Sequence, residues 1–143
     1  PIGGPKLEDI VTPDKRIAVI VDDGSRPTPI STILPVLLDQ LIRCGARRER
    51  IKIVIALGSH RYMTEDEMRE RVGEEIYQPT GGELRVPGSR KAGLYRGHRG
   101  GRALMATSSV MDADLRIGVG NLVPHPVMGW GGGGKIIFPG VGR

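Results

Sequence analysis

Two continuous apolar runs interrupt an otherwise mixed chain, and each has the pattern of a buried strand. The first covers residues 16–22 (RIAVIVD) and the second covers residues 51–57 (IKIVIAL). Both are rich in β-branched residues and lack a polar–apolar alternation, which is typical of strands covered on both faces. A third run at residues 114–119 (DLRIGV) predicts a further strand.

Apolar residues at helical spacing follow each of the first two runs. Residues 30–44 carry leucine and isoleucine on one helix face, and Gly45 provides a stop. Residues 64–72 begin with a capping box in which Thr64 is the cap, so a second helix is expected there. A short helix is also expected at residues 108–113.

Alternation of strands and helices predicts an α/β fold with an open, mostly parallel, Rossmann-like sheet. The 143 residues, 38% of them hydrophobic, are enough for one domain with a single core. Loops that follow parallel strands share one edge of the sheet, where ligands bind. That edge should gather residues 22–29 (DDGSRPTP), 58–61 (GSHR) and 120–134, a long loop that contains NLVPHP.

The net charge of +5 arises in one segment, residues 78–105, which holds six basic residues against one acidic residue. This segment has no apolar periodicity and is predicted to be an irregular basic loop or insert within the domain. A nucleic-acid partner is not expected, because Tyr95 is the only side chain there that could stack on a base. A solvated loop, a nucleic-acid-binding arm and a damaged stretch of sequence are the alternatives for it.

Several features bear on location and completeness. No apolar run approaches the length of about 18 residues that a membrane span needs, and no signal peptide is recognisable. The single Cys44 cannot form an internal disulfide, which favours a reducing, cytoplasmic compartment. The chain begins with Pro1 and ends at Arg143, just after a glycine-rich loop, so we expect an incomplete sheet from a truncated two-domain protein.

The three edge loops carry candidate chemistry. Arg26 lies between a turn and a proline, where its guanidinium could bind a carboxylate or phosphate; alternatively, the loop is a polar turn in which Asp23 caps the next helix. His60 follows the second strand directly, and a solvated surface histidine is its alternative. His125 is fixed between two prolines, which suits a positioned acid or base, whereas His98 is expected to be solvated.

Residues 129–140 (GWGGGGKIIFPG) contain a run of four consecutive glycines that Lys135 follows directly. It resembles a phosphate-binding P-loop, but Ile136 replaces the Ser or Thr that would hold Mg²⁺. The run also does not follow its strand directly, so nucleotide hydrolysis is not favoured. A mobile linker and a cradle of backbone N–H groups beside a lysine remain, and Trp130 and the apolar residues after Lys135 favour the cradle.

Together, DDGSRPTP, GSHR and NLVPHPVMGWGGGGKIIFPG resemble the amino-terminal domain of the nickel-pincer lactate racemase family. The ten-residue spacing of His125 and Lys135 fits the family's PH…GGxK pattern, and the resemblance covers residues 1–76 and 108–143. Family members racemise or epimerise 2-hydroxy acids with a nickel complex of pyridinium-3,5-bisthiocarboxylate mononucleotide, which is joined to a lysine through a thioamide. The resemblance implies that this cofactor is covalently bound to Lys135.

The same resemblance assigns the remaining roles. His60 and His125 match two catalytic histidines that move the hydroxyl proton on opposite faces of a small 2-hydroxy-acid substrate, while the cofactor takes the α-hydrogen as hydride. Enzymes of cofactor synthesis and nickel insertion are implied as partners. The loop expected to contact the cofactor consists of Asp23, Gly24, Ser25 and Arg26.

The sequence also departs from the family's pattern. Ser25 stands where threonine is usual, and residues 78–105 lack the expected apolar strand and Asn-His-Asp-like stretch. The protein ligand to nickel and the second domain have no counterpart up to Arg143, so the 143 residues are expected to be inactive alone. A non-catalytic module that binds an anion or nucleotide, and a degenerate reading frame, are the alternative interpretations.

Overall fold

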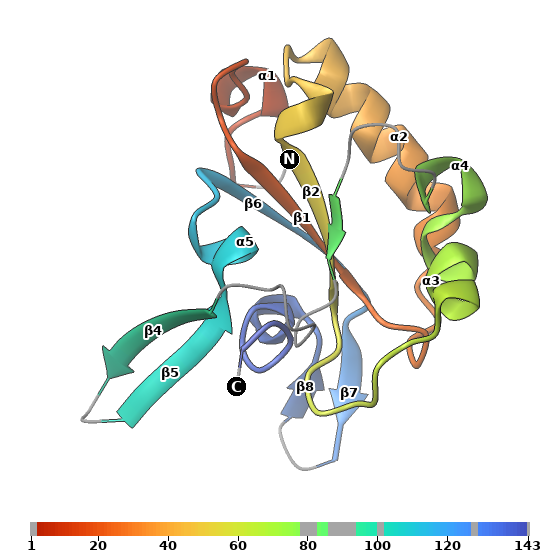
Figure 1. Ribbon diagram of the computed structural model, residues 1–143, viewed down its shortest axis with the longest axis vertical. Coiled ribbons are helices and arrows are strands. Elements are labelled where there is room, and N and C mark those ends of the chain that lie inside the picture. The colour runs from red at the N-terminus through yellow and green to blue at the C-terminus, as the bar shows by residue number, and fades with distance from the viewer. Residues whose placement is uncertain (1–2, 78–82, 86–93, 100–101, 127–128, 143) are drawn as a thin grey trace.

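A four-stranded parallel sheet with the order β3-β2-β1-β6 forms the centre of the computed structural model (Figure 1). The structure describes residues 3–77, 83–85, 94–99, 102–126 and 129–142. Every neighbouring pair in this sheet is parallel, which confirms the predicted open α/β architecture. Its strands are β1 (Ile17–Asp22), β2 (Ile51–Ala56), β3 (Glu83–Arg85) and β6 (Leu115–Val119).

Strand β1 lies in the middle of the sheet, between β2 and β6. Its first residue, Ile17, is in register with Ile51 of β2 and with Leu115 of β6. The first five residues of β1 are buried, as are five of the six in β2, so both strands have covered faces as their unbroken apolar sequences predict. The carboxyl end of β1 is therefore held from both sides.

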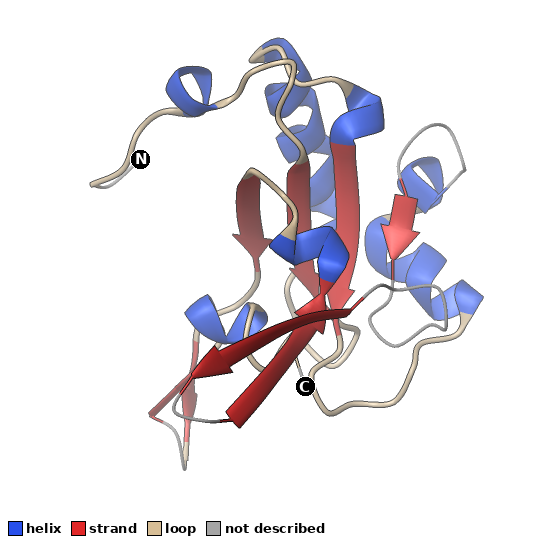
Figure 2. Ribbon diagram, turned by 60° about the vertical axis from the view of Figure 1, so that its left-hand side comes forward, coloured by secondary structure: helices blue, strands red, loops and turns tan. Residues whose placement is uncertain are grey.

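Helices cover one face of the sheet (Figures 1 and 2). Leu34, Leu41 and Val72 belong to the same buried cluster as Val19 and Ile53 of the strands. The predicted helices at residues 30–44 and 64–72 are confirmed, and the second is followed closely by a shorter one. The helical elements of this part are α1 (Leu7–Ile10), α2 (Ile30–Arg43), the 3-10 turn η1 (Arg48–Arg50), α3 (Glu65–Val72) and α4 (Glu74–Tyr77).

The boundary signals of these helices are those expected. The Glu67 N–H donates to Thr64 Oγ1 at 3.2 Å and the Thr64 N–H donates to Glu67 Oε2 at 2.8 Å, so the capping box forms. At the end of α2, Gly45 has a φ of +99°, a conformation that glycine adopts without a steric penalty. Sequence and structure agree on where these helices begin and end.

The opposite face is covered by short elements from the last third of the chain. Ala18, Ile20 and Val54 pack with Val110 of α5 (Ser108–Met111) and with Val141. Two backbone hydrogen bonds fix this cover: the Gly58 N–H donates to the Gly140 carbonyl at 2.8 Å, and the Thr107 N–H donates to the Val141 carbonyl at 3.2 Å. The segment after the glycine run is thus part of the core.

Two antiparallel hairpins correct the sequence interpretation. The prediction of an irregular loop across residues 78–105 is wrong at β3 and at the hairpin of β4 (Leu94–Arg99) and β5 (Arg102–Thr107). The rest of that segment, residues 78–82, 86–93 and 100–101, lies outside the described residues. Strands in this segment are held by backbone pairing rather than by an apolar pattern, so periodicity did not reveal them.

The segment after β6 was predicted to be one long loop, and this is wrong. It contains a short hairpin of β7 (Val123–His125) and β8 (Gly129–Gly131), followed by the 3-10 turn η2 (Gly133–Ile136). Three-residue strands that contain proline and glycine carry no readable alternation.

None of the helices in the described parts of the chain is both long and apolar enough to cross a membrane.

Candidate functional site

The loops that follow β1, β2 and β6 meet at one edge of the sheet, as the parallel arrangement predicts. Strand order reverses at β1, whose neighbours are β2 on one side and β6 on the other. In open α/β sheets, ligands bind outside the carboxyl ends of the strands at such a switch point. The candidate site is therefore built from the loop at residues 23–29, the loop at residues 57–64 and the β7–β8 hairpin.

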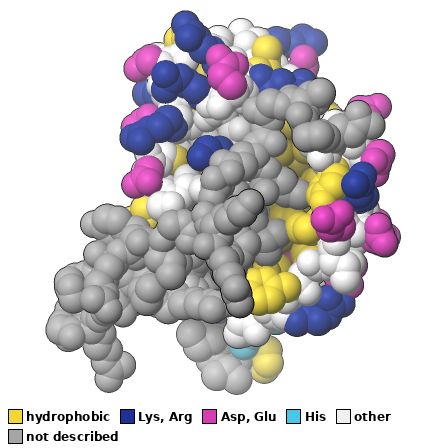
Figure 3. Space-filling view, in the orientation of Figure 1, with side chains coloured by type: hydrophobic (Ala, Val, Ile, Leu, Met, Phe, Trp, Pro, Cys, Tyr) yellow, Lys and Arg dark blue, Asp and Glu magenta, His cyan; other side chains and the backbone are white. Residues whose placement is uncertain are grey.

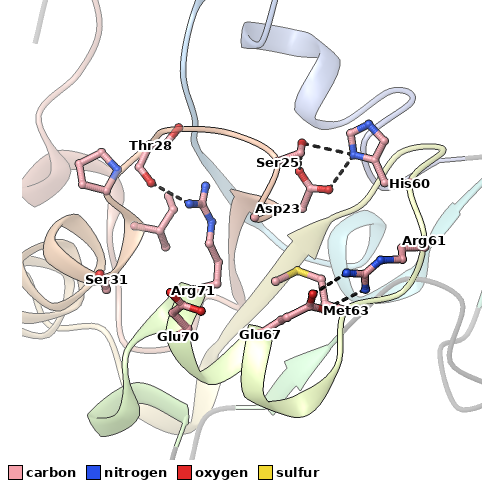
Figure 4. Close-up of a pocket in the computed structure, with 13 residues that line it drawn as sticks. Asp23, Ser25, Thr28, Ser31, His60, Arg61, Met63, Glu67, Glu70 and Arg71 are labelled. Atoms are coloured by element: carbon pink, nitrogen blue, oxygen red, sulfur yellow. Dashed lines mark hydrogen bonds and ion pairs between the residues drawn. The ribbon is translucent and has the colours of Figure 1, made fainter.

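A hydrogen-bonded group of three side chains lies between the first two loops (Figure 4). His60 Nδ1 is 2.6 Å from Asp23 Oδ2, and the Ser25 hydroxyl donates to Asp23 Oδ1 at 2.6 Å. Because a carboxylate only accepts hydrogen bonds, Nδ1 of His60 carries the hydrogen in this pair. That tautomer leaves Nε2 as the ring atom that can exchange a proton with a substrate.

Asp23 is the buried member of this group. Its side chain is 8% exposed, whereas that of His60 is 48% exposed. Burial alone would raise the pKa of Asp23, but hydrogen bonds from Ser25 and His60 outweigh it and hold the pKa below 3.8, its ordinary value. Asp23 is thus an anion at neutral pH that orients the more exposed imidazole. The helix-capping alternative for Asp23 is wrong, because Pro29 is the N-cap of α2 and no side chain caps that helix.

A pocket with a volume of about 630 Å³ opens beside this group. It is lined by the loop after β1, the start of α2, the loop after β2 and one side of α3. Asp23, Ser25 and His60 contribute to its wall, as do Arg61, Glu67 and Arg71 (Figure 4). Polar and charged side chains, His60 among them, line it together with apolar ones, which suits the binding of a small polar ligand.

An exposed ion pair forms the outer part of this wall. Arg61 Nη1 donates to Glu67 Oε2 at 2.9 Å, and the other guanidinium nitrogen contacts the second carboxylate oxygen. The hydrogen bond from Arg61 and that from the backbone of Thr64 lower the pKa of Glu67 to about 2. Because both side chains are well exposed to solvent, this pair contributes little to stability.

Arg71 is a member of the site that sequence reasoning missed. Its guanidinium lies beneath the loop after β1 and contacts Asp22, the last residue of that strand. One arginine among several in α3 has no distinguishing mark in the sequence. Its proximity to Val72, which is fully buried at the helix end, is the only signal that it lies near the core.

The glycine run forms a tight turn packed against the loop after β6. A Cβ atom on Gly132, which has a φ of +87°, would lie 1.9 Å from the Asn121 carbonyl oxygen, so only glycine fits. Ile136 packs with Val110 and Val141 beneath the sheet, and a Cβ on Gly118 would lie 3.1 Å from it. The isoleucine that breaks the P-loop pattern is therefore a core residue, and the turn leads to a four-residue 3-10 helix instead of a long α-helix.

Lys135 lies in this 3-10 turn and is half-buried. Its Nζ donates to the backbone carbonyl of Trp130 in β8, which holds the amine against the hairpin. Arg26 reaches the same place from the loop after β1: a Cβ on Gly131 would lie 4.0 Å from Arg26 Nη1. The structure thus brings the guanidinium of Arg26 to the glycine run that carries Lys135.

His125 ends β7 and pairs with Gly129 of β8, and its side chain is half-buried. The hairpin places it on the same element as the glycine run, but the pocket beside His60 is not lined by His125 or Lys135. Gly24 stands within the loop after β1, where a Cβ would lie 3.7 Å from Met63 Cε. The predicted residues therefore form two groups at one sheet edge, one around Asp23 and one on the hairpin.

Exposed hydrophobic side chains accompany the second group. Leu122, Trp130 and Phe138 are 64%, 61% and 50% exposed. Figure 3 shows hydrophobic side chains at the surface between the charged right-hand edge of the molecule and the residues drawn in grey.

Within the described residues, no three His, Cys, Asp or Glu side chains lie close enough to hold a metal ion.

Known proteins resemble this chain over its whole length. A family model described as the lactate racemase N-terminal domain matches residues 1–143. A lactate racemase of Thermoanaerobacterium thermosaccharolyticum is 35% identical over 144 residues, which is 99% of this chain and 33% of the relative. A lactate racemase of Lactiplantibacillus plantarum is 33% identical, with 99% of this chain and 33% of the relative covered.

Solved structures agree. The lactate racemase apoprotein of T. thermosaccharolyticum superposes with a TM-score of 0.83 at 33% identity, covering 100% of this chain and 34% of that chain. A Thermotoga maritima protein superposes with a TM-score of 0.69 over 95% of this chain and 36% of its own, and at 18% identity it supports the fold alone. This chain spans about a third of the length of the curated relatives that it matches.

Proposed function

Because the chain belongs to the family of lactate racemase N-terminal domains, we propose that it is the cofactor-binding part of an enzyme that racemises or epimerises a 2-hydroxy acid. The observation that carries this proposal is the pairing of His60 with the buried anion Asp23 at the edge of a pocket. If the hydrogen of C2 leaves as hydride, inversion of a hydroxy acid also needs a base that removes the hydroxyl proton, and this pair supplies one.

His60 takes or gives that proton at Nε2. Asp23 fixes the ring through Nδ1 and stabilises the imidazolium that forms, and Ser25 holds the second oxygen of the same carboxylate. His125, on the β7–β8 hairpin, does the same work from the opposite face of the substrate. When one histidine is neutral and the other is protonated, the first accepts the hydroxyl proton and the second returns a proton to the re-formed hydroxyl group, and the reverse reaction exchanges their roles.

The hairpin and the glycine turn after it offer groups that could hold the nickel pyridinium-3,5-bisthiocarboxylate mononucleotide. Lys135 offers a primary amine held against the Trp130 carbonyl, which suits covalent attachment through a thioamide. Arg26, beside Gly131, offers a guanidinium fork for the phosphate of the mononucleotide or for a carboxylate. When bound, the cofactor accepts and returns the hydrogen of C2 as hydride. The loop from Asp23 to Arg26 would line its other side.

The proposed substrate is a small 2-hydroxy acid. The proposed protein partners are the enzymes that build the cofactor and insert nickel. Cys44 is a free, half-buried thiol, which suits a reducing cytoplasm.

The test uses the full-length protein expressed together with cofactor-synthesis enzymes. Intact-mass and peptide mass spectrometry should show a covalent addition on the peptide that contains Lys135, and the protein should racemise lactate or another 2-hydroxy acid. Lys135→Arg, which keeps the positive charge, should lose both the addition and the activity. An unmodified Lys135 in a preparation that racemises its substrate would overturn the mechanism. Tight ATP binding without nickel would favour an anion-binding module instead.

A further inference from the structure

Arg71 holds the loop after β1 from below. From the last turn of α3, its Nε donates to the Asp22 carbonyl at 3.0 Å, and its Nη1 donates to the carbonyls of Arg26 at 3.1 Å and Thr28 at 2.8 Å. Its Nη2 contacts the Asp22 carboxylate. The side chains of Arg71 and Asp22 are only 11% and 13% exposed, so this fork is almost entirely removed from water.

Asp22 extends the same network to a third loop. Its Oδ2 accepts a hydrogen bond from the Thr28 hydroxyl at 2.5 Å and one from the Asn121 N–H at 3.3 Å. Asn121 follows β6, and Arg71 belongs to the helix after β2. A single carboxylate and a single guanidinium therefore connect the loop after β1 with α3, which follows the His60 loop, and with Asn121, which precedes the β7–β8 hairpin.

The geometry of this network confines the residues that do the proposed chemistry. The carbonyls of residues 22, 26 and 28 are all fixed by Arg71, so the chain between them must form a closed turn. Asp23 and Ser25, which hold His60, lie inside that turn. A planar guanidinium with five donors can satisfy three carbonyls and a carboxylate at once, whereas a lysine ammonium offers only three donors from one point.

Resting on the function proposed above, we propose that Arg71 is a positioning residue for the His60–Asp23 pair, acting through the loop after β1. Buried ion pairs add little net stability, because desolvation offsets the attraction between the charges. The arrangement of Arg71 and Asp22 serves conformational specificity: it selects one conformation for residues 23–28. Arg71 does not touch the reacting atoms, and its effect on the chemistry passes through the turn.

The experiment compares Arg71→Gln and Arg71→Lys in the full-length, cofactor-loaded protein, with Arg69→Gln as the matched control. Arg69 lies in the same helix, forms an exposed ion pair with Glu74 and stacks on Tyr77, so its replacement changes the same charge without touching the loop. Hydrogen exchange measured by mass spectrometry reports the loop through peptides that cover residues 22–30. Steady-state racemisation and the mass of the Lys135 peptide are measured in parallel.

Arg71→Gln should accelerate amide exchange in residues 22–30 by roughly tenfold or more, while peptides from β2 and α2 are unchanged. It should lower kcat by roughly 10-fold to 100-fold, with Lys135 still modified, since small misplacements of catalytic groups have effects of that size. Arg71→Lys should fall between Arg71→Gln and the wild type, and Arg69→Gln should match the wild type.

Unchanged exchange in the loop of Arg71→Gln, or an equal effect of Arg69→Gln, would overturn the inference. If Arg71→Gln does not fold, Arg71→Lys carries the test, because it keeps the buried charge and loses only the fork. If the wild-type protein lacks racemase activity, the proposed function fails, but loop exchange still decides whether Arg71 sets the conformation of residues 23–28.

Discussion

The two halves of the candidate site are held in place by different means. Around Asp23, side chains hold side chains: His60, Ser25 and the loop itself are fixed by hydrogen bonds to carboxylates and from Arg71. In the β7–β8 hairpin and the glycine turn that follows it, the backbone is held by close packing, with Gly132 pressed against the Asn121 carbonyl and Lys135 bonded to a main-chain oxygen. The first half depends on polar side chains and the second on the absence of side chains.

This difference has consequences for how each half responds to change. A hydrogen-bonded group loses function gradually, since an isosteric substitution keeps the shape and removes only part of the interaction. The close backbone approach at Gly132 has no such intermediate, because any Cβ atom there collides with the backbone of the loop after β6. The hairpin should therefore be the more fragile half, and the Asp23 group the more adjustable one.

Gly132→Ala is the largest predicted effect. The new Cβ would lie 1.9 Å from the Asn121 carbonyl oxygen at a φ of +87°. Overpacking against the backbone and strain in the left-handed region together should lower the free energy of unfolding of the full-length protein by about 3 kcal/mol. Denaturant unfolding followed by circular dichroism measures this loss, and mass spectrometry of the Lys135 peptide should show less cofactor attached.

Gly134→Ala is the matched control in the same run. A Cβ there meets no atom within 4 Å, so stability and cofactor attachment should stay close to those of the wild type. Equal losses in the two variants would mean that the hairpin depends on the flexibility of the whole run, and the contrast with the Asp23 group would have to be abandoned.

Asp23→Asn should have the next largest effect, and on activity instead of stability. Asparagine keeps the shape but removes the anion that orients His60 and stabilises its protonated form, so kcat for racemisation should fall by roughly 100-fold. Lys135 should remain fully modified, because the hairpin is untouched. Chiral chromatography of the product over time gives kcat, and the mass of the Lys135 peptide gives the loading. A normal kcat in a fully loaded Asp23→Asn variant would show that His60 works without its partner.

Glu67→Gln should produce the smallest effect and tests the exposed edge of the same half. Glutamine can still complete the capping box with Thr64, so only the charge opposite Arg61 is lost. The folded-state pKa of Glu67 is about 2, below the ordinary 4.5, so the pair stabilises the folded state above pH 4.5, and this contribution disappears as the pH falls toward 2. Thermal midpoints of wild type and variant should differ slightly at pH 7 and converge near pH 2. A gap that persists in acid would contradict the role of the charge.

The central fold could be predicted from sequence because its elements carry strong, local signals. β1 and β2 are continuous apolar runs, and α3 begins with a capping box that forms as expected. The hairpins could not be predicted in the same way. β4 is mostly polar and contains Gly97, β5 lies in the same basic segment without apolar periodicity, and β7 and β8 have three residues each, so their strand conformation comes from their pairing partners.

The location of the site could be predicted from the sequence, but the contacts within it could not. The edge of a parallel sheet follows from the order of strands and helices, and it brought the loops of Asp23, His60 and His125 together as expected. The contact between Asp23 and His60 depends on how far each loop extends, and the role of Arg71 depends on the angle at which α3 packs. Neither the extent of a loop nor the packing angle of a helix is encoded in a local pattern of residues.

The adjacent aspartates at the end of β1 illustrate how finely the length of one strand is set. Asp22 is bound to Arg71, Thr28 and Asn121 within the scaffold, whereas Asp23 faces His60 and the pocket. Removing one residue between Ile17 and Asp22 would put Asp23 where Asp22 now lies, and inserting one would put Asp22 where Asp23 now lies. Either change would leave one of the two partners, Arg71 or His60, without its own aspartate, so the length of β1 matters to the site as much as the identity of its last residues.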